Sequence, residues 1–116
     1  MEELFHKKLR KIMDDYVHFV YKITREFPRE ELYGVTSQIR RAALSIILNY
    51  IEGFARYREK SKQNFFRISY ASLKELKYLL HFALVEKYLS NDDYKKALNL
   101  ADEIGAMLFG IIRNEK

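Results

Sequence analysis

The side chains best suited to chemistry in this chain of 116 residues are basic groups gathered around one turn. Between positions 56 and 67, five basic residues stand against one acidic residue, and the rings of Tyr57, Phe65, Phe66 and Tyr70 are interleaved with them. Basic groups bind phosphates, and an exposed ring can stack on an unpaired base, so this pattern favours a contact with nucleic acid. The candidate contact residues are Arg56, Arg58, Lys60, Lys62 and Arg67.

The alternative for this turn is a loop that only keeps the protein soluble. We expect Phe65 on the inner face of the third helix, in the core. A second basic cluster near the start of the chain supplies the candidate secondary contacts Lys7, Lys8 and Lys11. A basic amphipathic helix can also lie on a membrane. The apolar face of this helix is needed inside the protein, however, so we favour nucleic acid as the partner. The net charge of +5 agrees with that partner but is weak support by itself.

No residue pattern typical of an enzyme or of a cofactor site occurs in the sequence. The three histidines His6, His18 and His81 lie far apart, and Glu3 to His6 is the only Glu-x-x-His motif. Di-iron bundles need two such motifs and two further glutamates, so we expect His6 on the surface and no metal site. Glycine-rich phosphate loops and the nucleophile elbow are also absent. We therefore expect a protein that is not an enzyme and that holds no cofactor.

Cysteine is absent, which excludes disulfides and thiolate chemistry and fits a reducing cytoplasm. The first residues are charged and contain no apolar stretch, so they do not resemble a secretory signal. No apolar run approaches the roughly 18 residues needed to cross a bilayer. We expect a cytoplasmic protein without a membrane contact.

Four helices are expected to position these residues. Apolar residues recur at spacings of three and four over about 2–27, 35–56, 62–87 and 91–113, with a polar turn at 58–61. Pro28 ends the first helix, and Ser90 with Asp93 is typical of an N-cap for the fourth. Short corners force antiparallel neighbours, which predicts an all-α, antiparallel up-down-up-down four-helix bundle. We expect it to form a single domain over residues 1–116.

The second helix carries more apolar surface than one bundle can bury. One stripe comprises Ile39, Ala42, Ala43, Ile46, Tyr50 and Phe54. A second stripe, more than a quarter-turn round the helix, comprises Leu44, Ile47, Leu48 and Ile51. An outer helix buries only about one side, so the second stripe is expected at an interface with another copy of the chain. The alternative is an asymmetric bundle that wraps this helix alone.

A narrow polar stripe fills the rest of the second helix. Its members are Gln38, Arg41, Ser45, Asn49, Glu52 and Arg56. This stripe is either a solvated face or a hydrogen-bonded network, between helices or subunits, that sets their register. In the second case we expect Arg41, Asn49 and Glu52 to act together.

The centre of the chain is similar to a known family. The motifs are Tyr33-Gly34, Gln38-Ile39-Arg40-Arg41-Ala42-Ala43, Ser45-Ile46, Asn49 and Glu52-Gly53, followed by Phe65, Ala71-Ser72 and Glu75-Leu76. Over about residues 16–89 they resemble the bacterial four-helix-bundle family named for proteins encoded by intervening sequences in 23S ribosomal RNA genes. The resemblance implies a homopentamer of such bundles without known catalysis. A related group, the accessory proteins of diversity-generating retroelements, shares this shape, is basic, and works with nucleic acid and a reverse transcriptase.

The chain departs from the family pattern in the first two helices. Ile47 stands where the family usually has proline, and Tyr50 or Ile51 stands near a usual alanine. An aromatic-rich element of the first helix is replaced by Ile12-Met13-Asp14-Asp15. Because Ile47 keeps its backbone N–H, we predict that the second helix is unbroken there.

Together these patterns predict a non-enzymatic homo-oligomer, pentameric by the resemblance, whose basic surface binds RNA or other nucleic acid. The alternative is a protein scaffold that docks another factor, such as a reverse transcriptase, through the polar stripe.

Overall fold

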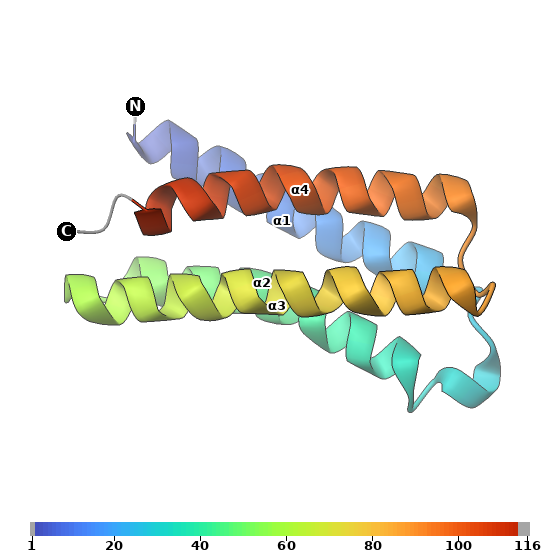
Figure 1. Ribbon diagram of the computed structural model, residues 1–116. Coiled ribbons are helices and arrows are strands. Elements are labelled where there is room, and N and C mark those ends of the chain that lie inside the picture. The colour runs from blue at the N-terminus through green and yellow to red at the C-terminus, as the bar shows by residue number, and fades with distance from the viewer. Residues whose placement is uncertain (1, 114–116) are drawn as a thin grey trace.

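Four helices make up most of the computed structural model, which describes residues 2–113. They are α1 (Glu2–Thr24), α2 (Val35–Ala55), α3 (Glu59–Val85) and α4 (Asn91–Arg113), with a short 3-10 helix, η1 (Arg29–Glu31), between α1 and α2. Successive helices run in opposite directions, so the starts of α1 and α3 lie at the same end as the ends of α2 and α4 (Figure 1). The predicted all-α, up-down-up-down bundle is confirmed, and residues 2–113 contain no strand. Residues 1 and 114–116 of the expected domain lie outside the described part.

Each helix packs against two neighbours in a closed ring of four. α2 makes its most extensive contact with α3, α3 also packs on α4, and α1 lies against both α2 and α4. In Figure 1 the axes of α3 and α4 are nearly aligned, and the axes of α1 and α2 are inclined to them. This arrangement encloses one continuous core.

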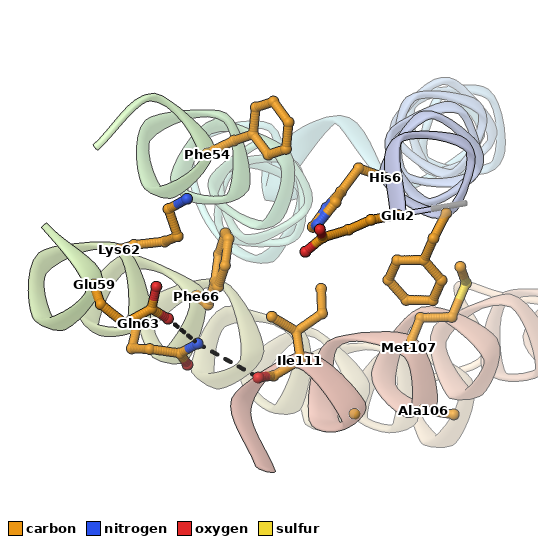
Figure 2. A pocket seen from close by; sticks show the side chains of 12 residues that line it. Glu2, His6, Phe54, Glu59, Lys62, Gln63, Phe66, Ala106, Met107 and Ile111 are labelled. Carbon is orange, nitrogen blue, oxygen red and sulfur yellow. Dashed lines mark hydrogen bonds between the residues drawn. The ribbon is translucent and has the colours of Figure 1, made fainter. Parts of the chain in front are cut away.

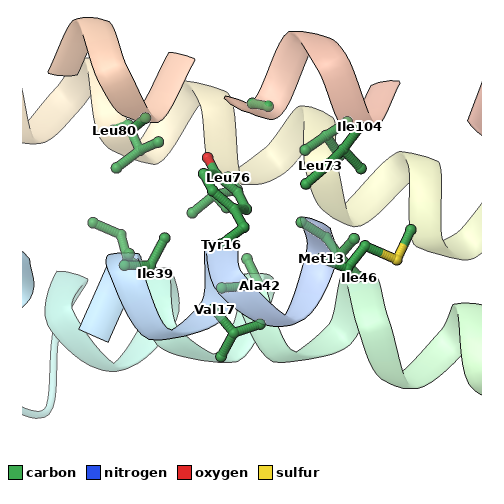
Figure 3. Packing of buried hydrophobic residues seen from close by; sticks show 14 of the residues in the cluster. Met13, Tyr16, Val17, Ile39, Ala42, Ile46, Leu73, Leu76, Leu80 and Ile104 are labelled. Carbon is green, nitrogen blue, oxygen red and sulfur yellow. The ribbon is translucent and has the colours of Figure 1, made fainter. Parts of the chain in front are cut away.

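The core is built from apolar residues that recur every three or four positions on each helix. Tyr16 and Met13 of α1 meet Ile46 of α2, Leu76 of α3 and Ile104 of α4 at its centre (Figure 3). The first apolar stripe of α2 is buried as predicted, apart from its last member, whose ring is half-exposed: Phe54. The prediction that the first apolar stripe faces the core is therefore confirmed over most of the length of α2.

The prediction that Phe65 lies in the core is wrong, and the buried ring is that of its neighbour. Phe66 is 1% exposed, whereas Phe65 is only partly buried. The buried residues of α3 are Gln63, Phe66, Ser69, Leu73, Leu76, Leu80 and Ala83. One residue turns a helix by about 100°, so this register places Phe65 and Ile68 towards the outside.

Small side chains let α2 and α3 approach closely. Ser69 Oγ donates a hydrogen bond to the backbone oxygen of Ile46 at 2.6 Å. A Cβ added to Gly53 would lie 2.8 Å from the Phe66 ring and 3.0 Å from a backbone oxygen of α3. α2 is continuous through Ile47, as predicted from the absence of proline.

Three helix ends differ from the predicted boundaries. α1 ends at Thr24, short of Phe27, and a turn with a Phe27 N–H to Thr24 oxygen bond of 3.2 Å leads into Pro28. α3 begins at Glu59, so most of the predicted polar turn belongs to its first turn. α3 ends at Val85 rather than near Lys87, whose left-handed backbone (φ 65°) closes the end.

The N-cap predicted for α4 is confirmed. The backbone N–H of Asp93 donates to Ser90 Oγ at 3.1 Å. This bond satisfies one of the free N–H groups of the first turn.

Polar contacts fasten the end of the bundle that carries η1, which we call the far end. The carboxylate of Glu31 accepts two hydrogen bonds, one from the backbone N–H of Val35 at 3.1 Å and one from the hydroxyl of Tyr88 at 2.9 Å. Arg40 Nε donates to Thr24 Oγ1 at 2.9 Å. Glu31 thus caps α2 and joins it to the connection between α3 and α4.

Candidate nucleic-acid interface

The bundle brings the two predicted basic clusters to one end of the molecule. Residues 56–58 link α2 to α3, and α1 begins beside the end of α2. Lys7 and Arg10 of α1 line one hollow together with Phe54 and Ala55 of α2. On the other side of Phe54, Lys62 shares a cavity with His6. Segments 2–11 and 52–67 therefore form one surface, which we call the basic end.

The whole net charge of the chain resides in the segments of the basic end. Segments 2–11 and 52–67 hold nine basic and four acidic residues, a balance of +5. The remaining 12 basic and 12 acidic residues cancel one another. A potential concentrated in this way attracts polyanions more strongly than the same charge spread over the surface.

Some of the predicted contact residues already form ion pairs or ring contacts within the chain. Arg56 Nη2 donates to Glu52 Oε2 at 2.6 Å, and its Cζ lies 4.6 Å from the centroid of the Phe65 ring. Lys11 Nζ lies 3.3 Å from Asp15 Oδ2 in an exposed pair. Such exposed pairs are weak and yield readily to a phosphate.

The remaining basic side chains lie on the surface. Those exposed are Lys7, Lys8, Arg58, Lys60 and Arg67. Lys62 is partly buried, and its Nζ lies 6.0 Å from the centroid of the Phe54 ring.

Of the four aromatic rings in the cluster, Tyr57 alone is fully exposed. It stands in the link between α2 and α3, where Arg56 and Arg58 have extended backbones with ψ of 144° and 136°. Phe66 is buried, while Tyr70 is partly buried and packs against Phe109. The ring suited to stacking on a base is therefore that of Tyr57.

A cavity of about 730 Å³ opens between the helix termini at the basic end, and all four helices line it (Figure 2). Gln63 lies in its wall, and its amide nitrogen donates to Glu59 Oε2 at 3.1 Å and to the backbone oxygen of Ile111 at 3.4 Å. Sequence reasoning missed Gln63 because a glutamine in a basic helix start carries no sign of burial.

His6 also lines the cavity, which corrects the expectation that it lies on the surface. Its ring is partly buried, with Nδ1 hydrogen-bonded to the hydroxyl of Tyr50 and the Phe54 ring 4.9 Å away. Burial lowers the pKa of His6, the positive charge of Lys62 lowers it further, and Glu2 acts in the opposite direction. The environment of the ring therefore favours its neutral form over the charged one.

Comparison with known proteins places the chain in a family. The model of the 23S rRNA-intervening sequence protein family matches residues 8–110. The chain belongs to this family. A solved crystal structure of a protein of unknown function, from the S23 ribosomal protein family of Bacteroides thetaiotaomicron VPI-5482, superposes with a TM-score of 0.88. The match covers 95% of this chain and 99% of that one at 19% identity, which shows a shared fold. No curated protein matches the sequence.

The polar stripe of this family member is divided between two local networks. Asn49 Nδ2 donates to Ser45 Oγ at 2.9 Å, and Ser45 Oγ lies 2.7 Å from Ser72 Oγ across the helix pair. Glu52 pairs instead with Arg56. Within residues 2–113, no hydrogen bond joins Arg41, Asn49 and Glu52 to one another.

Gln38 and Arg41 are exposed at the other end of the stripe. Together with Ser45 of α2 and Glu75 of α3 they line a polar groove of about 390 Å³.

The second apolar stripe of α2 is only partly free in the single chain. Ile47 is 9% exposed and lines a groove with residues of α1, so its cover comes from its own bundle and not from another copy. Leu44 is partly buried. Leu48 and Ile51 remain 58% and 40% exposed. Leu4 of α1 lies in the same groove as Ile51 and is also exposed, so the free apolar ridge comprises Leu4, Leu48 and Ile51.

Within residues 2–113, no group of three or more histidine, aspartate or glutamate side chains could hold a metal ion. None of the described helices is long and apolar enough to span a membrane.

Proposed function

We propose that this family member is a non-enzymatic homo-oligomer that binds structured RNA or other nucleic acid through its basic end. The observation that carries the proposal is the convergence of two basic clusters, distant in sequence, on one end of the bundle. That end holds the full net charge of +5. Lysine and arginine neutralise phosphates there, which favours binding to any strand of suitable shape.

Assembly would make this contact effective. A single copy offers few phosphate contacts, each of modest strength, whereas a ring of copies repeats the basic end around its axis. The ridge of Leu4, Leu48 and Ile51 supports an interface between copies, because a contact would remove these exposed apolar side chains from water. Lys7, Lys8 and Lys11 lie in the same groove as Leu4 and Ile51, so the interface would adjoin the basic end. The pentamer implied by the family resemblance is the assembly that we propose, acting in the cytoplasm and not on a membrane.

A protein scaffold is the second candidate function. The groove lined by Gln38, Arg41 and Glu75 presents exposed polar groups of both charges next to signature residues. Such a groove could hold a segment of another factor, and a reverse transcriptase is the candidate implied by the related accessory proteins.

A salt titration of RNA binding tests the first proposal. Fluorescence anisotropy would compare the wild type with a variant in which Arg56, Arg58, Lys60 and Lys62 are replaced by glutamine. A matched control replaces four exposed basic residues outside the basic end: Lys22, Arg25, Arg29 and Lys95. Both variants lose the same charge, so a site-specific contact predicts loss of binding only in the first.

Wild-type affinity should also fall steeply between low and physiological salt, because the released counterions bind again. Equal affinities for the wild type and both variants, or a flat salt response, would favour the protein scaffold.

A further inference from the structure

The cavity at the basic end has the dimensions and walls of a ligand site. Its volume of about 730 Å³ lies within the range of roughly 300–1,000 Å³ that small-molecule sites occupy. Phenylalanine rings from three helices, Phe5, Phe54 and Phe66, line it, and Figure 2 shows the rings of Phe54 and Phe66 at its rim and wall. Phe5 and Phe54 are partly exposed and give a planar ligand apolar faces to lie against, while the buried Phe66 ring lies beneath them in the wall.

One polar atom of the cavity wall is buried and lacks a partner. Gln63 is 3% exposed, and its Oε1 accepts no hydrogen bond from residues 2–113. Its amide nitrogen is fixed by Glu59 and the Ile111 backbone oxygen, which are both acceptors, so the unpaired atom is the carbonyl oxygen (Figure 2). A buried acceptor without a donor is unfavourable, and an N–H group from a ligand would satisfy it.

The cavity also lies between the two basic clusters. Lys62 of α3 and His6 of α1 both line it, while Lys7 and Arg10 line the adjoining hollow. A phosphate backbone held by both clusters would therefore cross the mouth of the cavity.

We propose that the cavity receives one unpaired base of the bound RNA, an inference that rests on the proposed function. The base lies against the exposed rings of Phe5 and Phe54 while the basic side chains hold the neighbouring phosphates. The Watson–Crick edge of every base carries at least one N–H group, so each base can donate to Gln63 Oε1 and sequence preference is small. A paired base has that edge occupied and cannot enter, so the site selects single-stranded segments and loops.

Gly110 allows the cavity to be filled without disturbing the core. It lines the cavity, and a Cβ added there meets no atom within 4 Å. Gly110→Leu places a side chain in this space and also favours the helix. Gly110→Ala is the matched control, since it makes the same backbone change and leaves most of the space open.

The test compares three RNAs with equal numbers of phosphates by fluorescence anisotropy: a single strand, the same strand without bases, and a blunt-ended duplex without a loop. We expect the wild type to bind the single strand about tenfold more tightly than the other two, as base–aromatic stacking predicts. Gly110→Leu should lose this preference and keep the duplex affinity, whereas Gly110→Ala should behave as the wild type. Circular dichroism would check that both variants are folded.

The outcomes separate this inference from the proposed function. Salt-sensitive binding with equal affinity for all three RNAs would overturn the base site and leave the proposed function intact. A single-strand preference that Gly110→Leu retains would place base recognition elsewhere, for example at Tyr57, and would also overturn the inference. Absence of binding to every RNA would overturn both.

Discussion

Tyr16 places a hydroxyl at the centre of the core without a partner in residues 2–113. A buried, unpaired hydroxyl lowers stability by about 1–3 kcal/mol, so Tyr16→Phe should leave the free energy of unfolding unchanged or raise it. Tyr50→Phe is the matched variant: that hydroxyl is bonded to His6, and its removal should lower stability by about 1 kcal/mol. Urea denaturation measures both, and equal losses would mean that the Tyr16 hydroxyl finds a partner.

His6 should make stability depend on pH. Burial, reinforced by Lys62 and opposed by Glu2, lowers its pKa in the folded state. As the pH falls through the ordinary value of about 6.5, the unfolded chain therefore binds more protons than the folded one, and stability decreases. The contribution of His6 is complete above that pH and is lost towards the lower folded pKa.

The measurement for His6 is the free energy of unfolding of wild type and His6→Gln from about pH 7.5 down to pH 5.5. Glutamine keeps a hydrogen-bonding group near Tyr50 but does not titrate. The wild type should lose more stability than the variant over this interval. Parallel curves would contradict a lowered pKa of His6 in the folded state.

Single residues were the least predictable level from sequence. Phe65 and Phe66 are adjacent rings, and the sequence pattern fits either one facing the core, so a register difference of one residue decided the error. His6 looked like a surface residue because its burial depends on Tyr50 and Phe54, more than forty positions away. Gln63 is buried by the end of α4, a contact that no local pattern indicates.

At the scale of helices, the approach of α2 to α3 should be sensitive to a single methyl group. Gly53→Ala would push a Cβ to within 2.8 Å of the Phe66 ring and 3.0 Å of backbone, so the pair must separate. We expect a loss of about 1–3 kcal/mol, although alanine favours a helix over glycine.

Gly110→Ala is the control for this prediction, because it adds the same methyl group where no atom lies within 4 Å. It should raise stability by up to about 1 kcal/mol. Thermal unfolding of the two variants, followed by circular dichroism, should therefore shift in opposite directions. Shifts of the same sign would show that α2 and α3 are not in tight contact at Gly53.

Helices were predictable from sequence, but their ends were less so. The period of apolar residues gave four helices in the right order, and Ser90 marked the start of α4 because its hydroxyl caps the helix. The start of α3 carries no such mark, since Arg58 occupies the N-cap position without a side-chain bond. The end of α3 could not be predicted either, because Lys87 adopts the left-handed conformation that is usually found at a glycine after a helix.

For the whole molecule, the apolar ridge should control assembly. Leu48→Lys with Ile51→Lys places two charges in the proposed interface and should yield monomers of unchanged helicity. Light scattering measures the mass, and Tyr78→Lys is the control, since Tyr78 is 64% exposed on α3. A double variant with the mass of the wild type would show that copies do not meet at this ridge.

The two basic clusters meet because neighbouring helices are antiparallel. Both clusters and the order of the helices could be predicted from the sequence, so the basic end could have been predicted too. The sequence could not show that Ile47 is covered by α1, because that depends on the inclination of one helix to another. The cavity was equally hidden, since it arises where helix termini diverge and not from any motif.

The two ends of the bundle are fastened by different contacts. Glu31 and Arg40 join the segments of the far end, whereas the His6–Tyr50 and Gln63–Ile111 bonds at the basic end lie around an open space. Because no core side chains fill this space, amide hydrogens in the last turns of α2 and α4 should exchange faster than those in the last turns of α1 and α3. Local opening of this kind would let the basic end accommodate strands of different width while the far end keeps the helices aligned.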